Sequence, residues 1–409
     1  MLLANPRATR TGYPAPLQAI LSVAGAQESR RWLSCWEALR PGPTPLYALE
    51  GLAQELGLGQ VLLKDESVRS GLGSFKALGA PIALVRLVLR MWPHEQLDAQ
   101  ALFAGRHRGL LRELTVISAT DGNHGRALAA AARSLGCRCV IVLHAHVSAE
   151  REQAIAAYGA EIVRITGNYD DSVAEAARLA AAKGWHVVSD TSYEGYEDIP
   201  RDVMQGYGTI AAEIVESLAD SAPPTHVFLQ GGVGGFAAAI VSYFWETCGA
   251  RRPSVVVVEP EQADCLYQSA LQGRPAKATG SVDSVMAGLA CGETSPLAWR
   301  FLEPGADWFM TLGDDAAVAA MRRLARGNGG DLPIVAGESG AAGLAALLQL
   351  VQAPELASRV GLGRDARVLV VNTEGATAPS VYRQLVGEPA DAVGARQEAF
   401  LQRRGGETA

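Results

Sequence analysis

A lysine in a loop of small residues is the first candidate for chemistry. Lys76 stands in the stretch GLGSFKALG, with Phe75 beside it and glycines on both sides. Because glycine has no side chain, the backbone here can approach a flat ring closely, and a lysine amine can bond covalently to a carbonyl carbon. An ordinary lysine at the start of a helix is the alternative interpretation of this stretch.

Two further polar segments follow apolar, strand-like runs. In SATDGNHG, Asp121 and Asn123 stand in a turn that holds more polar groups than a helix cap requires. In VLVVNTEG, Thr373 offers a hydroxyl that could hydrogen-bond a ring nitrogen. Capping and turn formation are the ordinary roles of these residue types. Ligands of parallel sheets bind at the carboxyl ends of the strands, so these residues are candidates for a binding site.

A glycine-rich segment, QGGVGGFAAA, lies between another apolar run and a predicted helix. Backbone N–H groups at such a helix start bind anions. The candidate anion-binding residues are Gly231, Gly232, Val233, Gly234 and Gly235. The spacing from Gly232 to Ala237 also matches the dinucleotide fingerprint, and Glu259 stands about where a ribose-binding carboxylate would be expected. The segment is compatible with a nicotinamide dinucleotide and with a single phosphate.

Together, the four segments are typical of one cofactor. They supply an amine for a covalent bond, a donor to a ring oxygen, a phosphate-binding loop and a hydroxyl partner for a pyridine nitrogen. These are the requirements of pyridoxal 5'-phosphate, which we predict as the cofactor.

Alternating strands and helices must position these segments. Short β-branched runs such as VLLKDE, LTVISAT and SVVVVEP alternate with Ala- and Leu-rich helices. This pattern predicts an α/β fold of mostly parallel, twisted sheets flanked by helices. We predict that residues 1–83 and 191–409 form a large, cofactor-anchoring domain and residues 84–190 a small, mobile domain. The charged, Gly-rich tail after Glu388 is expected to fray.

The composition argues against nucleic-acid and membrane partners. A net charge of −7 on 409 residues, without a basic stripe, does not favour phosphate backbones. The apolar run APIALVRLVLRMW is interrupted by Arg86 and Arg90 and is too short to cross a bilayer. The N-terminus lacks the order of a secretory signal, so we expect a cytoplasmic protein.

Cysteine and histidine usage predicts thiols rather than disulfides or metal sites. Six cysteines occur without a CxxC pair, which indicates a reducing compartment. Cys265 and Cys291 are expected near the site as plain buried thiols, and a close approach of the two sulfur atoms is the alternative. His144 and His146 lack a third ligand at suitable spacing, so no metal is predicted.

The order SFK, DGNHG and GGVGG resembles the fold type II pyridoxal phosphate enzymes, the tryptophan synthase β-like group. Within that group, DTSYEGYEDIP and MAGLACGE are similar to segments of the diaminopropionate ammonia-lyases. The resembling segments run from Lys64 to Gly375. The chain departs from these lyases just before Phe75, where it has Gly73-Ser74, a pair closer to that of threonine synthases, instead of Asn-Ala.

The resemblance implies how the cofactor is held. Lys76 would carry the covalent bond, with Phe75 packed beside the ring. Asn123 would bond the phenolic oxygen and Thr373 the pyridine nitrogen. The glycine-rich segment would bind the phosphate.

The resemblance also implies a reaction. This is α,β-elimination of ammonia from D- and L-2,3-diaminopropionate, giving aminoacrylate, which decays with water to pyruvate and a second ammonia. The resemblance also implies a homodimer. Asp121 and Asp190 would lie over the substrate, and two carboxylates suit a β-ammonium group that serine and threonine lack. A serine/threonine-type dehydratase, a β-replacing enzyme of the same fold and an NAD-dependent oxidoreductase are the alternatives.

Overall fold

The computed structural model describes residues 1–120, 122–145, 147–167, 169–327 and 330–406. They form one seven-stranded and one four-stranded sheet. The large sheet runs, in spatial order, β1 (Leu2–Ala4), β10 (Trp308–Leu312), β9 (Ser254–Pro260), β8 (His226–Gln230), β11 (Arg367–Asn372), β3 (Gln60–Asp65) and β2 (Leu46–Ala48). The small sheet runs β6 (Glu161–Arg164), β5 (Arg138–Leu143), β4 (Thr115–Ala119) and β7 (His186–Val187).

Both sheets are parallel except at the edges of the large one. There, β1 pairs with β10 and β2 pairs with β3 in antiparallel fashion. The predicted fold class, mostly parallel sheets flanked by helices, is confirmed.

Helices cover both faces of the large sheet because its central strands are apolar on both sides. Val227, Leu229 and Val257 pack into a core that includes α10 (Asp198–Ser217), α11 (Gly235–Cys248) and α13 (Pro296–Gly305). Their strand neighbours Phe228 and Val256 pack on the opposite face against α14 (Asp314–Arg326) and α15 (Ala342–Gln352). Successive residues of a strand point to opposite faces, so the valines of a run such as VVVV pack against helices on both sides of the sheet.

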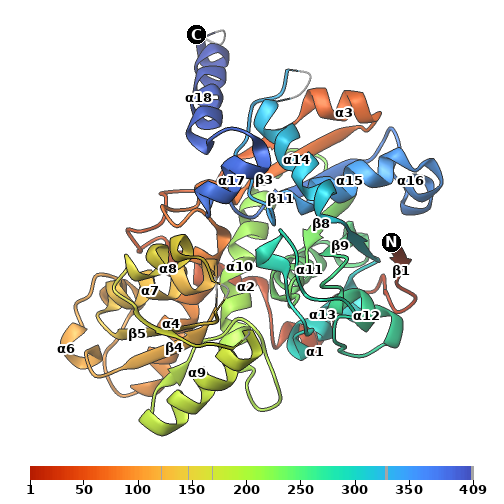
Figure 1. Cartoon of the computed structure of the whole chain (residues 1–409). Coiled ribbons are helices and arrows are strands. Elements are labelled where there is room, and N and C mark those ends of the chain that lie inside the picture. Colours follow the sequence, from red (N-terminus) through yellow and green to blue (C-terminus); the bar gives the residue numbers. More distant parts are fainter. Residues whose placement is uncertain (121, 146, 168, 328–329, 407–409) are drawn as a thin grey trace.

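The small sheet is covered in the same way. Val116 and Ile141 pack with α4 (Ala80–Met91) and α7 (Asn123–Leu135), while Ile117 and Val140 pack with α9 (Tyr169–Lys183). Helix α4 also lies against α10, so the two sheets share one apolar core. Figure 1 shows the small sheet with α7, α8 (Ala149–Ala156) and α9 in yellow tones beside the rest of the chain. All four strands of this sheet fall within the predicted small domain, whose boundaries remain a prediction.

The remaining elements are short, with one exception. They are α1 (Ala15–Gln18), α2 (Val23–Leu33), α3 (Glu50–Leu56), α5 (Ala99–Phe103), α6 (Arg108–Leu111), α12 (Cys265–Gln272), α16 (Pro354–Val360), α17 (Pro379–Val386), α18 (Ala390–Gly406), and the 3₁₀ turns η1 (Glu66–Val68), η2 (Phe75–Leu78), η3 (Gly249–Arg251) and η4 (Ala287–Leu289).

The exception, α18, extends away from the body of the molecule (Figure 1), and the expectation of a frayed tail there was wrong. Its Arg396 pairs with Glu388 before the helix and donates to the Ala325 carbonyl, which anchors the helix start. No helix of the described ranges has the length and apolar composition to cross a bilayer.

Candidate active site

The loop that carries Lys76 is held on the end of β11. Phe75 N–H donates to the Thr373 carbonyl over 3.0 Å, and Gly375 N–H donates to the Gly73 carbonyl over 2.9 Å. Gly73 has a φ of +71°, in the left-handed region that favours glycine. The Gly73-Ser74 pair thus forms a turn that delivers Lys76 to the carboxyl end of the large sheet.

The Lys76 amine forms an ion pair with Asp190. It also lies 5.2 Å from the centroid of the Phe75 ring and 5.7 Å from that of Tyr207. The two charged side chains are 19% and 22% exposed, so solvent and a ligand can still reach them. Burial opposes the charge on Lys76, but the Asp190 carboxylate outweighs it and raises the pKa of Lys76. Likewise, burial alone would raise the pKa of Asp190, and the Lys76 ammonium lowers it.

His124, which the sequence analysis did not single out, belongs to the same cluster. Its Nε2 lies 2.9 Å from the Val188 carbonyl oxygen, and its Nδ1 lies 3.9 Å from an Asp190 oxygen. Burial lowers the pKa of His124, which favours the neutral ring. Because a carbonyl only accepts, Nε2 carries the proton, and Nδ1 has no hydrogen-bond partner among the described residues. The sequence signal that could have indicated His124 is the unusual number of polar groups in the segment DGNHG.

Asn123 and Thr373 also reach this region. The Asn123 amide donates to Glu374, across the gap between the two sheets, with an N–O distance of 2.5 Å. Gly122, rather than Asn123, stands at the N-cap position of α7. Thr373 is buried next to the lysine loop. Asp121 lies outside the described residues.

The glycine segment forms an open backbone cradle between β8 and α11. Among the described residues, the N–H groups of Val233, Gly234 and Gly235 have no backbone or side-chain acceptor. A Cβ atom at Gly232 would lie 3.1 Å from Cys291 Sγ and 3.2 Å from the Gly288 carbonyl oxygen, so a larger residue would crowd the loop. Unpaired N–H groups at the start of a 14-residue helix fit a phosphate group.

Glu259 is not available to a ribose. Its two carboxyl oxygens accept the Leu266 and Tyr267 N–H groups at 2.7 Å each, at the start of α12, and the side chain is buried. Burial raises the pKa of Glu259. The carboxyl group that could have completed a dinucleotide site is therefore a helix-capping group.

Cys265 and Cys291 flank the glycine segment. Cys265 Sγ lies 3.4 Å from the Gly232 carbonyl oxygen, and Cys291 Sγ lies where a side chain at Gly232 would meet it. Neither forms a disulfide, and neither do the other four cysteines. Cys265 is buried, whereas Cys291 is partly exposed. His146, one of the two histidines considered as metal ligands in the sequence, lies outside the described residues.

Comparison with known proteins identifies the family. The family model described as "Pyridoxal-phosphate dependent enzyme" matches residues 38–374. The diaminopropionate ammonia-lyase of Salmonella typhimurium is 41% identical over 353 residues, which cover 84% of this chain and 87% of that protein. The chain belongs to the diaminopropionate ammonia-lyase family of pyridoxal-phosphate dependent enzymes. The Escherichia coli K12 lyase is 40% identical over 356 residues, covering 86% of this chain and 89% of the relative.

Solved structures agree with this membership of the diaminopropionate ammonia-lyase family. The selenomethionine holo form of the Escherichia coli lyase superposes with a TM-score of 0.86 at 38% identity, covering 94% of this chain and 96% of that one. Its complex with an aminoacrylate-PLP azomethine reaction intermediate gives a TM-score of 0.85 at 37% identity with the same coverage. The family resemblance and the cofactor predicted from the sequence are confirmed.

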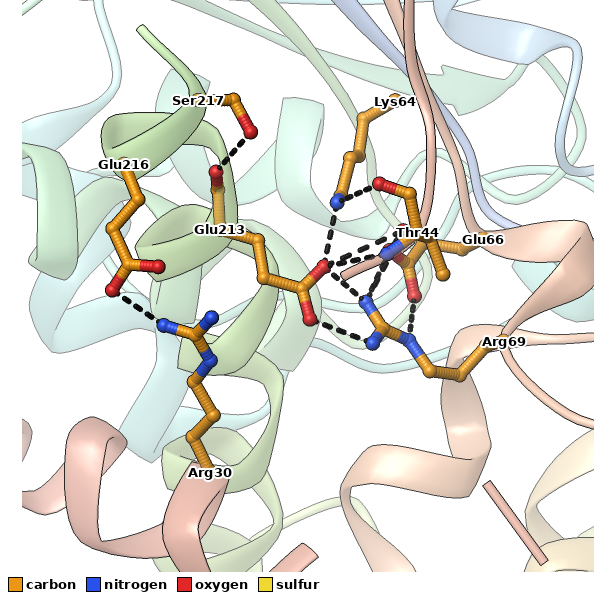
Figure 2. Close-up of polar contacts among 8 residues, drawn as sticks. All are labelled: Arg30, Thr44, Lys64, Glu66, Arg69, Glu213, Glu216 and Ser217. Carbon is orange, nitrogen blue, oxygen red and sulfur yellow. Dashed lines mark hydrogen bonds and ion pairs between the residues drawn. The ribbon is translucent and has the colours of Figure 1, made fainter. Parts of the chain in front are cut away.

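In this member of the family, a buried charge cluster joins residues 64–69, which precede the lysine loop, to Glu213 of α10 (Figure 2). The fully buried Lys64 amine lies 2.6 Å from a Glu213 oxygen and 2.7 Å from the Thr44 carbonyl oxygen. Arg69 bridges Glu66 and Glu213 with contacts of 2.7–2.8 Å. The Lys64 amine is therefore held inside this cluster, and Lys76 is the lysine that remains as the candidate for the covalent bond.

Proposed function

We propose that the protein eliminates ammonia from 2,3-diaminopropionate, giving aminoacrylate and one ammonia, with pyridoxal 5'-phosphate as cofactor. Water then hydrolyses the aminoacrylate to pyruvate and a second ammonia. The observation that carries the proposal is the Lys76–Asp190 pair beside the Phe75 and Tyr207 rings. It places an amine and a carboxylate at the end of the sheet, in a chain whose relatives are diaminopropionate ammonia-lyases.

The residues present fit the cofactor. Lys76 would hold it covalently, beside Phe75, and the N–H groups of Val233, Gly234 and Gly235, within the segment Gly231–Gly235, would hold its phosphate. When bound, the cofactor withdraws electrons from the α-carbon and so makes the α-hydrogen acidic. Asn123 would donate to the ring oxygen and the Thr373 hydroxyl would meet the ring nitrogen.

The proton and charge movements are assigned to side chains. The free Lys76 amine takes the α-proton of the L-isomer. In the ion pair, the Lys76 ammonium lowers the pKa of Asp190 against burial and keeps it a carboxylate; in the reaction the β-ammonium group of the substrate would take the place of that ammonium. Asp121 is assigned the α-proton of the D-isomer, on the opposite face.

A substrate panel with pyruvate readout tests the proposal. Diaminopropionate should give the highest kcat/KM, well above serine and threonine. Borohydride should fix the cofactor to Lys76, identified by peptide mass. Higher kcat/KM on serine or threonine would assign the protein to the dehydratases, and an adduct on Lys64 would refute the site.

The proposal extends to the assembly and its location. The family resemblance supports a homodimer, and six cysteines without a disulfide support a reducing compartment such as the cytoplasm. Residues 84–190 are proposed to move as a small domain over the substrate. Light scattering of the purified protein would test the dimer.

A further inference from the structure

Glu374, in the segment NTEG after β11, joins three loops of the site. Its side chain is only 4% exposed. Its carboxyl oxygens accept the Asn123 amide at 2.5 Å, the Ser339 N–H at 3.1 Å and the Thr377 hydroxyl at 3.4 Å. Its backbone forms an antiparallel bridge with Ser74 in the lysine loop. Glu374 thus contacts the lysine loop, the start of α7 and the segment GESG (residues 337–340).

The GESG segment is shaped around this carboxyl group. Gly337 N–H donates to the Glu374 carbonyl over 2.9 Å. A Cβ atom at Gly337 would lie 2.9 Å from Glu374 Cγ, and one at Gly340 would lie 2.6 Å from the Glu374 carbonyl oxygen. Larger residues would push this segment off Glu374. The glycines therefore let the backbone close on the side chain and fix its direction.

The groups around the carboxyl oxygens determine how Asn123 must point. The three polar groups that contact them are an amide NH₂, a backbone N–H and a hydroxyl, and each can donate. An ionised carboxylate only accepts, so only the nitrogen of the Asn123 amide can face it. The NH₂ group has two hydrogens. One is bound by Glu374, and the other is left for a second acceptor.

We propose that Glu374 is a positioning residue that fixes the amide orientation of Asn123, so that an N–H rather than the amide oxygen faces the cofactor. A reversed amide would present its oxygen to the cofactor oxygen and repel it. This inference rests on the proposed function for the identity of the ligand of Asn123. Glu374 itself need not contact the cofactor or the substrate.

The decisive variant is Glu374→Gln. Because the Ser339 N–H can only donate, the glutamine oxygen should face it, and the glutamine NH₂ should then face Asn123 and favour the reversed amide. The cofactor is removed from the holoenzyme, and the apoprotein is then titrated with pyridoxal 5'-phosphate. Affinity should fall about 10- to 100-fold, the range for a lost hydrogen bond to a charged group, with a shifted visible absorption band. Glu338→Gln, which alters the adjacent buried carboxyl group, is the matched control and should bind the cofactor within about twofold of wild type.

A double-mutant cycle separates positioning from a general structural effect. If Glu374 acts through Asn123, Glu374→Gln should change cofactor affinity little in an Asn123→Ala background. Unchanged affinity and spectrum in Glu374→Gln, or an equal loss in both backgrounds, would overturn the inference.

If Glu374→Gln does not fold, Asn123→Asp is the second test. Its carboxylate would face the Glu374 carboxylate without a hydrogen atom between them, so the variant should bind the cofactor more weakly than Asn123→Ala. Equal weakening in the two variants would overturn the inference. These readouts need no substrate. A protein that binds the cofactor but releases no pyruvate from diaminopropionate would therefore refute the proposed function alone.

Discussion

At the scale of single residues, the site is a set of paired opposite or complementary groups. Lys76 faces Asp190, with the neutral ring of His124 behind the carboxylate. Asn123 faces Glu374. Each pair joins the two sides of the site, so one substitution changes both the local charge and the contact between loops.

Substrate choice should depend on the charge of Asp190. In Asp190→Asn, the β-ammonium group loses a charge-assisted partner. The transition state for diaminopropionate should therefore lose about 2–3 kcal/mol of stabilisation, as measured by kcat/KM, and the residual turnover of serine should fall less. Pyruvate release from both substrates measures this. Asp198→Asn, an exposed aspartate at the start of α10, is the control. An equal loss on both substrates would mean that Asp190 does not discriminate between them.

The buried carboxyl group of Glu338 should make stability depend on pH. Burial, together with Glu374, raises the pKa of Glu338 from 4.5 to about 7, although Arg151 opposes this. Since the folded pKa is the higher one, this stabilisation is complete below pH 4.5 and is lost as the pH rises through about 7. Wild type should lose about 3 kcal/mol of unfolding free energy between about pH 5 and pH 8 that Glu338→Gln does not lose. Urea denaturation across that range measures it, and parallel slopes would contradict it.

At the scale of elements, α10 connects the sheets to the lysine loop. It packs on α4 and α11 and supplies Glu213 to the buried charge cluster. Figure 2 also shows Glu216, one turn further along the same helix, paired with Arg30 at the surface. The two glutamates therefore offer the same chemistry in opposite environments.

Glu213→Gln should destabilise the protein far more than Glu216→Gln. The first leaves Lys64 and Arg69 buried with one carboxylate, at a cost of about 3–5 kcal/mol. The second breaks a pair whose carboxylate is 53% exposed, at a cost below about 1 kcal/mol. Thermal or denaturant unfolding distinguishes them. Similar losses in both variants would show that the cluster adds little stability.

The elements also show what the sequence could predict. Strands such as β8 and β9 were predictable because their apolar runs are long and bounded by turn residues. The Trp308–Leu312 strand was missed because a short apolar run of that kind does not distinguish a strand from a buried helix. The two three-residue strands depend on tertiary pairing alone.

Site prediction had a similar limit. Lys76 and Asn123 were predicted from residue type and loop context and Asp190 from the family resemblance, and the structure pairs Lys76 with Asp190. The contact between Asn123 and Glu374 and the capping role of Glu259 were beyond reach. The first depends on how loops 251 positions apart meet, and the second on how the chain after Glu259 turns back to place the Leu266 and Tyr267 N–H groups on its carboxylate.

At the scale of the whole molecule, the cofactor would contact loops from both sheets, so it should stabilise the entire fold. Tm should rise with free pyridoxal phosphate, with unfolding free energy growing by about 1.4 kcal/mol per tenfold increase above the Kd. NAD at the same concentrations should give no shift, because Glu259 is already hydrogen-bonded. Calorimetry with each ligand measures this, and stabilisation by NAD alone would reverse the cofactor assignment.

The two short antiparallel strands at the margins of the large sheet have a consequence for self-association. Each is three residues long, so the sheet ends in very little unpaired backbone at both edges. Long, flat edges invite strand-by-strand addition of a second chain and, eventually, aggregation. Here such addition has almost no template. Copies of this protein should therefore meet through helices and loops, and concentrated solutions should resist fibril formation for as long as the fold is intact.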